Sequence, residues 1–526
     1  MSPLRPAGKY SSDKMKSFDV HTVFESDNYY LFSSDSDNIS LSDTKRVTDK
    51  RYLTVHEGAE LLDAAFILKG LRNVTLDFGG AVITLIGRIQ PFIIDGCENI
   101  TLKNVTVEYE RSLFTELDVI RNTGKELVAE IKDKFPCRVE NGNFIPYGRD
   151  YEDRELYKKG CMFIQAFDKI TGEGRGLDVI YLGENIIPEP SPPASNIKHI
   201  RVRNEGGNIA FIGEFPSHWD DTVSIVLEHE NRFKSSVAMY HSRNIKIENY
   251  RILNGCGMGF LAIGTENINL DGVRLFRDGL SHGIVTNSAD GIHFVACKGR
   301  IILRDSIFEG MIDDALNIHS NFYHSIGAES NRLFARKSEL SHALNAYSEV
   351  FAVGDEIAVY KGCTLEERGR YKLTGVEIAD RWAVTLTTES PIIAEKGDII
   401  ENISSNPEIY IESCRFGKAN SHLRFQSRGK TVIEGCQFSL PVLLTGDMNY
   451  WFEASPVNDF TLKGCTFTGE RGRVRIIPDF TPTEKAPYYH KNIRITNNIF
   501  GVTEPVEVHG AKDVVIENNV INNGSA

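Results

Sequence analysis

Hydrophobic and polar positions alternate in short segments along most of the chain, and one phrase of this kind recurs. It reads roughly Asn-Ile-x-Ile, then a small or polar residue, then an aromatic or aliphatic one. Clear copies are NITLKNVTVEY from Asn99, NIKIENYRIL from Asn244, NINLDGVRLF from Asn267, DFTLKGCTFTG from Asp459 and NIRITNNIFG from Asn492. Alternation with a period of two predicts short strands that bury one face rather than long helices.

The spacing of these copies indicates how the strands are arranged. The copies follow one another about every 22 to 29 residues, which suits one coil of a parallel β-helix. A propeller blade needs four strands and about 40 residues, so the spacing argues against a propeller. Stacked coils place equivalent residues about 4.8 Å apart, in ladders. We predict one such ladder of small polar side chains at Cys414, Cys436, Cys465, Asn498 and Asn519.

The phrase disappears twice, between residues 112 and 236 and between residues 321 and 407. Both stretches still contain alternating strands, such as TVSIVLEHE and WAVTLTTES, and each is too long to be a plain loop. We therefore predict an all-β chain in which two antiparallel β-barrel-like domains, 112–236 and 321–407, interrupt a right-handed parallel β-helix. The helix comprises residues 51–111, 237–320 and 408–526. Residues 1–50, rich in Ser and Asp, are expected to form a cap or arm over its open end.

Charge and hydropathy narrow the class of partner. The 526 residues carry a formal net charge of −13, which argues against nucleic acid because nucleic-acid binding needs a basic patch. No apolar run is long enough for a membrane-spanning helix, so no membrane partner is expected. The composition suits a neutral oligosaccharide substrate. The inserted β-domains could mediate a homodimer.

The N-terminus and the cysteines bear on location and cofactors. Residues 1–30 lack the apolar core of a secretory signal, which favours a cytoplasmic protein, or a secreted one if a signal was removed. The nine cysteines are odd in number and contain no CxxC pair, which argues against disulfides and against a zinc site. We expect no cofactor and no metal.

The richest polar stretch is HGIVTNSADGIHFVACKGRIILRDSIFEGMIDDALNIHSNFYH, from His282 to His324. Asp290 and Asp313 are 23 residues apart, or one coil, so their side chains should lie on adjacent coils, with Asp314 beside them. Three ionised carboxylates in one groove repel one another, so at least one pKa should rise and the cluster should titrate as a coupled set. Hydrolysis of a glycoside requires such a split between one protonated acid and one base.

Parity along the following strand adds further candidates. Leu316 and Ile318 should point into the core. The residues of the other parity are Asp313, Ala315, Asn317 and His319. We therefore expect Asp313, Asn317 and His319 to line one external groove. His293 and His319 are expected to lie close to the aspartates, and the weaker candidates in the same stretch are His282, Asn287 and His324.

ADGIHFVACKG at 289–299, followed by DDALNIH at 313–319, resembles glycoside hydrolase family 110. The resemblance implies an exo-acting, inverting α-galactosidase that acts on terminal α-1,3-linked galactose, on a parallel β-helix with β-barrel insertions. It covers most of residues 55–520 in architecture, with its specific motifs at 282–319 and 446–453. GDMNYWFEAS at 446–455 is similar to a family segment near the sugar, which would contribute Asn449, Trp451 and Glu453.

Residue by residue, the resemblance implies that Asp313 is the general acid and that Asp290 and Asp314 hold and activate the water. Inversion implies an acid–base separation of roughly 6.5–9.5 Å. A tryptophan face would stack on the galactose ring, and amide or carboxylate groups would bind its hydroxyls. The predicted substrate contacts are Asn287, His293, Asn317, His319, Arg424, Asn449, Trp451 and Glu453, with Gln426 as a further candidate on the same strand as Arg424.

Three alternatives stay open. NSAD at 287–290 and DD at 313–314 also resemble polygalacturonases, but the Gly-His-Gly and Arg-Ile-Lys motifs of those enzymes are missing. Anionic uronates need clustered cations, and the stretch from 282 to 324 holds only Lys298, Arg300 and Arg304, which favours a neutral sugar. A non-catalytic glycan-binding β-helix would leave the carboxylates without a purpose. A calcium-dependent lyase would use them as metal ligands.

Overall fold

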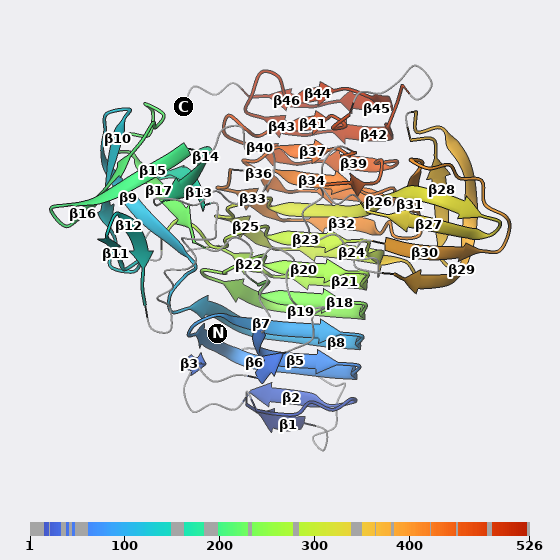
Figure 1. The fold of residues 1–526 in the computed structure, drawn as a ribbon, viewed down its shortest axis with the longest axis horizontal. Coiled ribbons are helices and arrows are strands. Elements are labelled where there is room, and N and C mark those ends of the chain that lie inside the picture. Colours follow the sequence, from blue (N-terminus) through green and yellow to red (C-terminus); the bar gives the residue numbers. More distant parts are fainter. Residues whose placement is uncertain are drawn as a thin grey trace.

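The computed structural model describes most of the chain. The described residues are 15–19, 21–32, 38–41, 45–47, 62–148, 162–182, 198–229, 234–276, 283–337, 350–362, 364–379, 383–420, 422–448, 451–480 and 487–522. Within these ranges the backbone forms no α-helix, and strands β1 (Met15–Phe18) to β46 (Val520–Ile521) make up the fold. Figure 1 shows a stack of coils with one small β-domain on either side.

In the central coils, each coil contributes one strand to one sheet and two consecutive strands to another. In one coil these are β20 (Phe260–Ile263), β21 (Glu266–Asp271) and β22 (Arg274–Leu275), and in the next they are β23 (Ile292–Val295), β24 (Lys298–Arg304) and β25 (Ile307–Glu309). Every strand pairs in parallel with its counterpart: β20 with β23, β21 with β24, and β22 with β25. This pairing from coil to coil confirms the predicted parallel β-helix.

Alternation of side chains builds the interior of the helix. In β24, Ile301 and Leu303 are fully buried, whereas Arg300 and Arg304 face solvent. A column of phenylalanine rings runs through the core with centroids 4.6–5.6 Å apart. Its members are Phe308, Phe416, Phe438, Phe467 and Phe500. Burial of these large apolar rings is a main source of the stability of the stack.

The predicted ladder of small polar side chains is confirmed. The backbone N–H of Cys414 donates to Sγ of Cys436, and that of Cys436 donates to Sγ of Cys465, each at 3.4 Å. Asn498 and Asn519 continue the ladder, each accepting at Oδ1 from the preceding member at 2.9 Å. Cys465 and Asn498 are 33 residues apart, so some coils are longer than the predicted interval.

A second ladder explains why the recurring phrase begins with asparagine. Asn73, Asn99, Asn244 and Asn267 have φ between 53 and 57°, the left-handed region that asparagine tolerates better than most residues. The side-chain amides of Asn99, Asn244 and Asn267 each donate to Oδ1 of the asparagine one coil earlier, at 2.7–2.9 Å. The corner between the two sheets therefore requires this residue type for both backbone and side-chain reasons.

The first inserted domain is a closed barrel of seven strands. They are β9 (Phe114–Asn122), β10 (Glu126–Ile131), β13 (Met162–Asp168), β14 (Gly174–Leu182), β15 (Lys198–Glu205), β16 (Asn208–Ile212) and β17 (Val223–Glu228). Six neighbouring pairs are antiparallel, as predicted, but β14 and β15 are parallel. The chain leaves the helix after β8 (Glu98–Tyr109) and re-enters it at β18 (Val237–Tyr240).

The second inserted domain shares a strand with the helix. The first half of β26 (Leu316–Glu329) pairs in parallel with β23 and β34 (Leu423–Gln426). Its second half pairs antiparallel with β27 (Arg332–Arg336) and β31 (Ile399–Asn402), and β28 (Glu356–Tyr360), β29 (Glu367–Ile378) and β30 (Ala383–Thr388) close the barrel. The strand is therefore continuous across residue 320, where the sequence pattern predicts a boundary.

The described part of the predicted cap contributes strands of its own. β1 pairs in parallel with β2 (Tyr29–Phe32), and β2 pairs in parallel with β6 (Arg72–Leu85). Phe18 packs edge-on against Phe66 and Phe78, with centroids 6.2 and 5.2 Å away. These contacts cover the apolar end of the stack with aromatic side chains.

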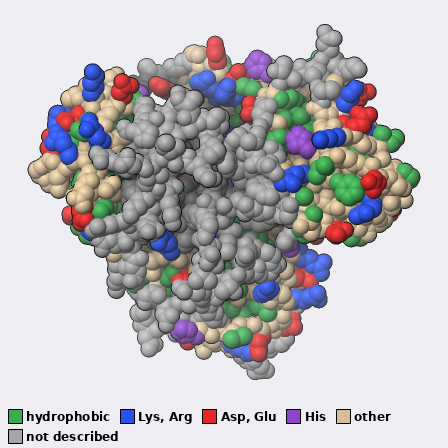
Figure 2. Space-filling model, viewed as in Figure 1, with side chains coloured by type: hydrophobic (Ala, Val, Ile, Leu, Met, Phe, Trp, Pro, Cys, Tyr) green, Lys and Arg blue, Asp and Glu red, His purple; other side chains and the backbone are tan. Residues whose placement is uncertain are grey.

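Surface charge is mixed. Acidic and basic side chains lie side by side on both barrels in Figure 2. Among the described residues, no helix is long and apolar enough to cross a membrane. The expectations about partners and cellular location stay predictions.

Candidate active site

The register between β23 and β26 decides which aspartates face each other. Ile292 pairs with Leu316, and the backbone N–H of Gly291 donates to the carbonyl of Asp314 at 2.9 Å. The coil is therefore 24 residues long at this point, and the counterpart of Asp290 is Asp314. The 23-residue interval that pointed to Asp313 is wrong by one residue, because in this register Asp290 lies opposite Asp314.

Arg424 brings the carboxylates together. It lies on β34, one coil beyond β26, and its Nε is 2.9 Å from Oδ2 of Asp314. The pKa of Arg424 is raised above its usual range, chiefly by Asp314 and further by Glu453, Asp313 and Asp290, although burial opposes the shift. All three predicted aspartates therefore lie within the field of one guanidinium.

The three aspartates differ in their access to solvent. The exposed fraction is 2% for Asp290 and 5% for Asp314, whereas Asp313 is only partly buried. Oδ1 of Asp313 accepts the backbone N–H of Asp314 at 3.0 Å, and Oδ1 of Asp314 accepts that of His422 at 3.2 Å. Burial and the charge of Arg424 lower the pKa of His422 to about 4, so its ring is neutral near pH 7.

Asp290 begins a chain of buried imidazoles. Its Oδ2 is hydrogen-bonded to Nδ1 of His293, whose Nε2 lies 3.1 Å from Nε2 of His319. The two rings are perpendicular, and Nδ1 of His319 donates to the carbonyl of Ser320 at 2.5 Å. Burial lowers the pKa of His319 to about 4, despite the opposing effect of Glu453.

Glu453 joins this chain from a distant part of the sequence. It lies on β38 (Glu453–Ala454), which pairs antiparallel with β26. Its Oε1 is 3.6 Å from Nε2 of His319, and its Oε2 accepts from the amides of Asn317 and Gln426, each at 3.1 Å. Burial alone would raise the pKa of Glu453, but the histidines, Arg424 and the Asn317 hydrogen bond together lower it. The site therefore holds a buried, ionised carboxylate.

The parity argument is only partly confirmed. Leu316 and Ile318 lie in the core, and Asn317 and His319 lie on the opposite side, as predicted. Ala315, however, belongs to the core, because the strand begins at Leu316 and its alternation does not extend into the preceding turn. Asn317 and His319 are 3% and 1% exposed, so they form the floor of the site rather than an open groove.

Of the remaining predicted substrate contacts, the structure describes Asn287 and Trp451. Asn287 is fully buried, and its Nδ2 donates to the carbonyl of Asp290 at 2.7 Å, so it holds the turn that carries this aspartate. Trp451 is partly buried, and its backbone N–H donates to the carboxylate of Asp447. Asn449 and His282 lie outside the described residues. Whether any of these side chains contacts a sugar stays a prediction.

Two charged or titratable residues of the site carry no signal in the sequence pattern. His422 is one, and Lys337, fully buried in the second barrel, is the other. Nζ of Lys337 donates to Oδ1 of Asn321 at 2.9 Å, and burial lowers its pKa to about 7 against the charges of Glu453 and Asp447. Only the folding of the second insertion against the helix brings this lysine to the site.

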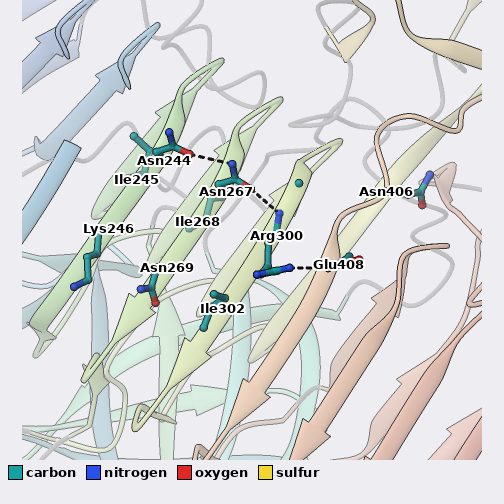
Figure 3. Close-up of a pocket in the computed structure, with 11 residues that line it drawn as sticks. Asn244, Ile245, Lys246, Asn267, Ile268, Asn269, Arg300, Ile302, Asn406 and Glu408 are labelled. Carbon is teal, nitrogen blue, oxygen red and sulfur yellow. Dashed lines mark hydrogen bonds and ion pairs between the residues drawn. The ribbon is translucent and has the colours of Figure 1, made fainter. Parts of the chain in front are cut away.

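A separate groove of about 720 Å³ lies on the outer face of the helix. Figure 3 shows its lining, in which Asn244 and Asn267 belong to the corner ladder and Arg300 reaches Glu408 at 3.4 Å. Glu408 supplies its only lining carboxylate among the described residues. This groove lacks a pair of acids, so we place the candidate active site at the three aspartates.

Comparisons with known proteins agree with the sequence motifs. No family model matches the chain. "Alpha-1,3-galactosidase B" of Bacteroides thetaiotaomicron is 27% identical over 83% of this chain and 71% of its own length. The protein of the same name from Akkermansia muciniphila is 26% identical over 82% of this chain, which spans 54% of that relative. Among solved structures, PfbA, a surface adhesin of Streptococcus pneumoniae, is 10% identical, with a TM-score of 0.27 and coverage of 94% of this chain and 71% of its own.

Proposed function

We propose that this protein is an exo-acting, inverting glycoside hydrolase that releases terminal α-linked galactose from oligosaccharides. The observation that carries the proposal is the arrangement of Asp290, Asp313 and Asp314 around the guanidinium of Arg424. The similarity to relatives named alpha-1,3-galactosidase, over more than four fifths of the chain, supports galactose as the sugar.

The environments of the aspartates suit different roles. Asp314, in its ion pair with Arg424, and Asp290, hydrogen-bonded to His293, are suited to hold and deprotonate a water molecule. Asp313, the most exposed of the three, is suited to protonate the leaving oxygen of a sugar that approaches from solvent. One acid and one base on opposite sides of the sugar ring are what inversion requires.

The surroundings of the aspartates suit a neutral sugar. The guanidinium of Arg424 is already occupied by carboxylates of the protein, so it is a poor partner for an anionic uronate. Trp451 is partly exposed, and its ring would offer an apolar face to galactose. Asn317 and Glu453 lie deeper and would orient the groups that contact the sugar.

Hydrolysis of α-1,3-galactobiose and of a panel of aryl glycosides, followed by proton NMR, tests this function. We expect β-galactose as the first product. Asp313→Asn should reduce kcat on galactobiose by about 10²–10⁴-fold, the usual contribution of a general acid. The loss should be much smaller on dinitrophenyl α-galactoside, whose leaving group needs no proton. Asp305→Asn, on an exposed turn with φ 47° that asparagine also accepts, is the matched control.

Each other outcome would correct a different part of the proposal. α-Galactose as the first product would overturn inversion. An equal loss on both substrates would remove Asp313 from the role of acid. Cleavage of a different glycoside, lost in Asp313→Asn, would overturn the sugar while keeping the site, and no cleavage at all would favour a glycan-binding protein.

A further inference from the structure

Two buried imidazoles face each other in an arrangement that neutral rings alone do not explain. Nε2 of His293 and Nε2 of His319 are 3.1 Å apart. Nδ1 of His319 is bonded to a backbone carbonyl, which can only accept, so this nitrogen carries the proton. Nδ1 of His293 is bonded to the carboxylate of Asp290. An ionised carboxylate can likewise only accept, so this nitrogen would also carry the proton.

The tautomers that follow place two lone pairs against each other. When Nδ1 of each ring carries the proton, both Nε2 atoms are bare acceptors. Two bare acceptors at 3.1 Å repel each other unless a positive charge lies beside both of them. That charge can be one extra proton or one metal ion, and the rest of the cluster distinguishes the two.

Glu453 supplies a third donor at the same point. Its Oε1 is 3.6 Å from Nε2 of His319, and the three donor atoms of His293, His319 and Glu453 all lie within 4.8 Å of one another. Its Oε2 is held by the amides of Asn317 and Gln426, which aims Oε1 at the imidazoles. A carboxylate would also stabilise a proton shared between the two nitrogens, but three donor atoms that converge on one point are the arrangement that a metal ion requires.

The distances suit a first-row divalent ion. Zinc binds histidine nitrogen at about 2.0–2.1 Å, so two nitrogens on a tetrahedral ion are roughly 3.3 Å apart. The observed separations of 3.1 and 3.6 Å lie on either side of this value. Two histidines with one glutamate form a known zinc ligand set that leaves one position for water or substrate.

The partners behind the histidines match the second shell of a metal site. A ligating histidine usually donates its other N–H to a carboxylate or a backbone carbonyl, which fixes the ring. Here Asp290 serves His293 in this way, and the carbonyl of Ser320 serves His319. Asp290 and Ser320, which provide these contacts, are 2% and 1% exposed, so the rings are held before any ion binds.

The negative charges around His293, His319 and Glu453 also favour the binding of a cation. Five carboxylates act on Arg424 and Lys337, two basic side chains whose electrostatic partners include Glu453. The carboxylates are Asp290, Asp313, Asp314, Asp447 and Glu453. Four of them are buried, and buried carboxylates in excess of their counter-charges are costly, so a divalent ion would offset part of this cost.

We propose that His293, His319 and Glu453 bind one divalent transition-metal ion, with zinc as the best match to the ligand set. This departs from the prediction made from the cysteines that the protein binds no metal, because here histidines and a glutamate supply the ligands. The ion would lock the barrel strand β26, the neighbouring coil and β38 together. If the proposed function holds, it would also fix Asp290 through His293.

Metal content of the untagged full-length chain, measured by mass spectrometry after gel filtration, tests the proposal without any substrate. We expect about one zinc per chain in the wild type and in His509→Ala, whose side chain is 65% exposed and far from these ligands in the register of the coils. His319→Ala and Glu453→Gln should lose at least nine tenths of it. Because the glutamine side chain has nearly the same shape, Glu453→Gln should stay folded.

A second measurement covers the case in which a variant fails to fold. Wild-type protein stripped with dipicolinate should bind Co²⁺ with visible ligand-field bands of a four- or five-coordinate site, and added Zn²⁺ should abolish them. A folded wild type that carries no more metal than His319→Ala and takes up neither ion would overturn the proposal. The histidine pair would then hold a shared proton. If the wild type carries about one zinc per chain but releases no galactose, the proposed function would be rejected and the metal site would stand.

Discussion

Oδ2 of Asp314 and Nε of Arg424 are 2.9 Å apart, and the two residues lie on adjacent coils of the helix. The carboxylate side chain is 7% exposed and that of the arginine 30%, so the pair is largely removed from water. In such a setting the loss of one partner is costly because the other charge stays behind. This pair ties the geometry of the predicted base to the stacking of the coils.

Arg424→Met should therefore destabilise the protein and impair it as a catalyst. We expect a loss of roughly 3 kcal/mol in the free energy of unfolding, the lower end of the range for a broken buried pair, because the arginine is partly exposed. Denaturant titration measures this loss of stability. Kinetics on galactobiose measure the accompanying fall in kcat. Arg494→Met, at an exposed position on β42 (His490–Thr496), is the control and should change neither quantity.

Asn287→Ala separates a positioning residue from a sugar contact. Its amide donates to the carbonyls of Ala289 and Asp290 at 3.3 and 2.7 Å, so its removal should loosen the turn that carries Asp290. We expect kcat to fall at least tenfold while KM changes little, since a buried side chain cannot reach the substrate. A rise in KM with an unchanged kcat would instead support the prediction that Asn287 binds the sugar.

The phenylalanine column should behave as one packed unit. Phe438 is 1% exposed and stacks on Phe416 and Phe467, with centroids 5.6 and 4.8 Å away. Phe438→Ala should cost about 3–5 kcal/mol in the free energy of unfolding, and Phe438→Leu clearly less, because leucine leaves a smaller cavity. Equal effects of the two changes, measured by denaturant titration, would show that the column relaxes around the gap.

His490 should make the protein acid-labile. Burial lowers its pKa to about 3, and its Nδ1 accepts the backbone N–H of Val457 at 3.1 Å. The unfolded chain takes up a proton below about pH 6.5 while the folded chain does not, so stability falls as the pH drops from 6.5 towards 3. The loss should approach about 1.4 kcal/mol for each pH unit in that window.

His490→Gln checks this expectation, since glutamine can still accept from Val457 but does not titrate. The melting temperature of the variant should fall less than that of the wild type between pH 7 and pH 4. Parallel pH profiles for the two proteins would show that other groups cause the acid lability. At pH 7 and above, where the histidine is neutral in both states, this titration should make no difference between them.

Much of the architecture can be predicted from local patterns of apolar and polar residues. Alternating apolar residues such as Ile301 and Leu303 determine which face of a strand is buried. The recurrence of this alternation along the chain predicts stacked coils. The ladder from Cys414 to Asn519 is predictable for the same reason, since equivalent slots in successive coils must lie side by side. The aspartates could be singled out because two coils of neighbouring sequence carry them.

Only the tertiary structure decides how the site is completed. The 24-residue register that pairs Asp290 with Asp314 depends on where the hydrogen-bonded strand begins, which a count of residues does not reveal. Glu453 reaches the histidines because β38 returns to β26 over a separation of more than 130 residues, and Lys337 arrives through the folding of a barrel. Such contacts depend on the path of the whole chain, and alternation along a single strand carries no information about that path.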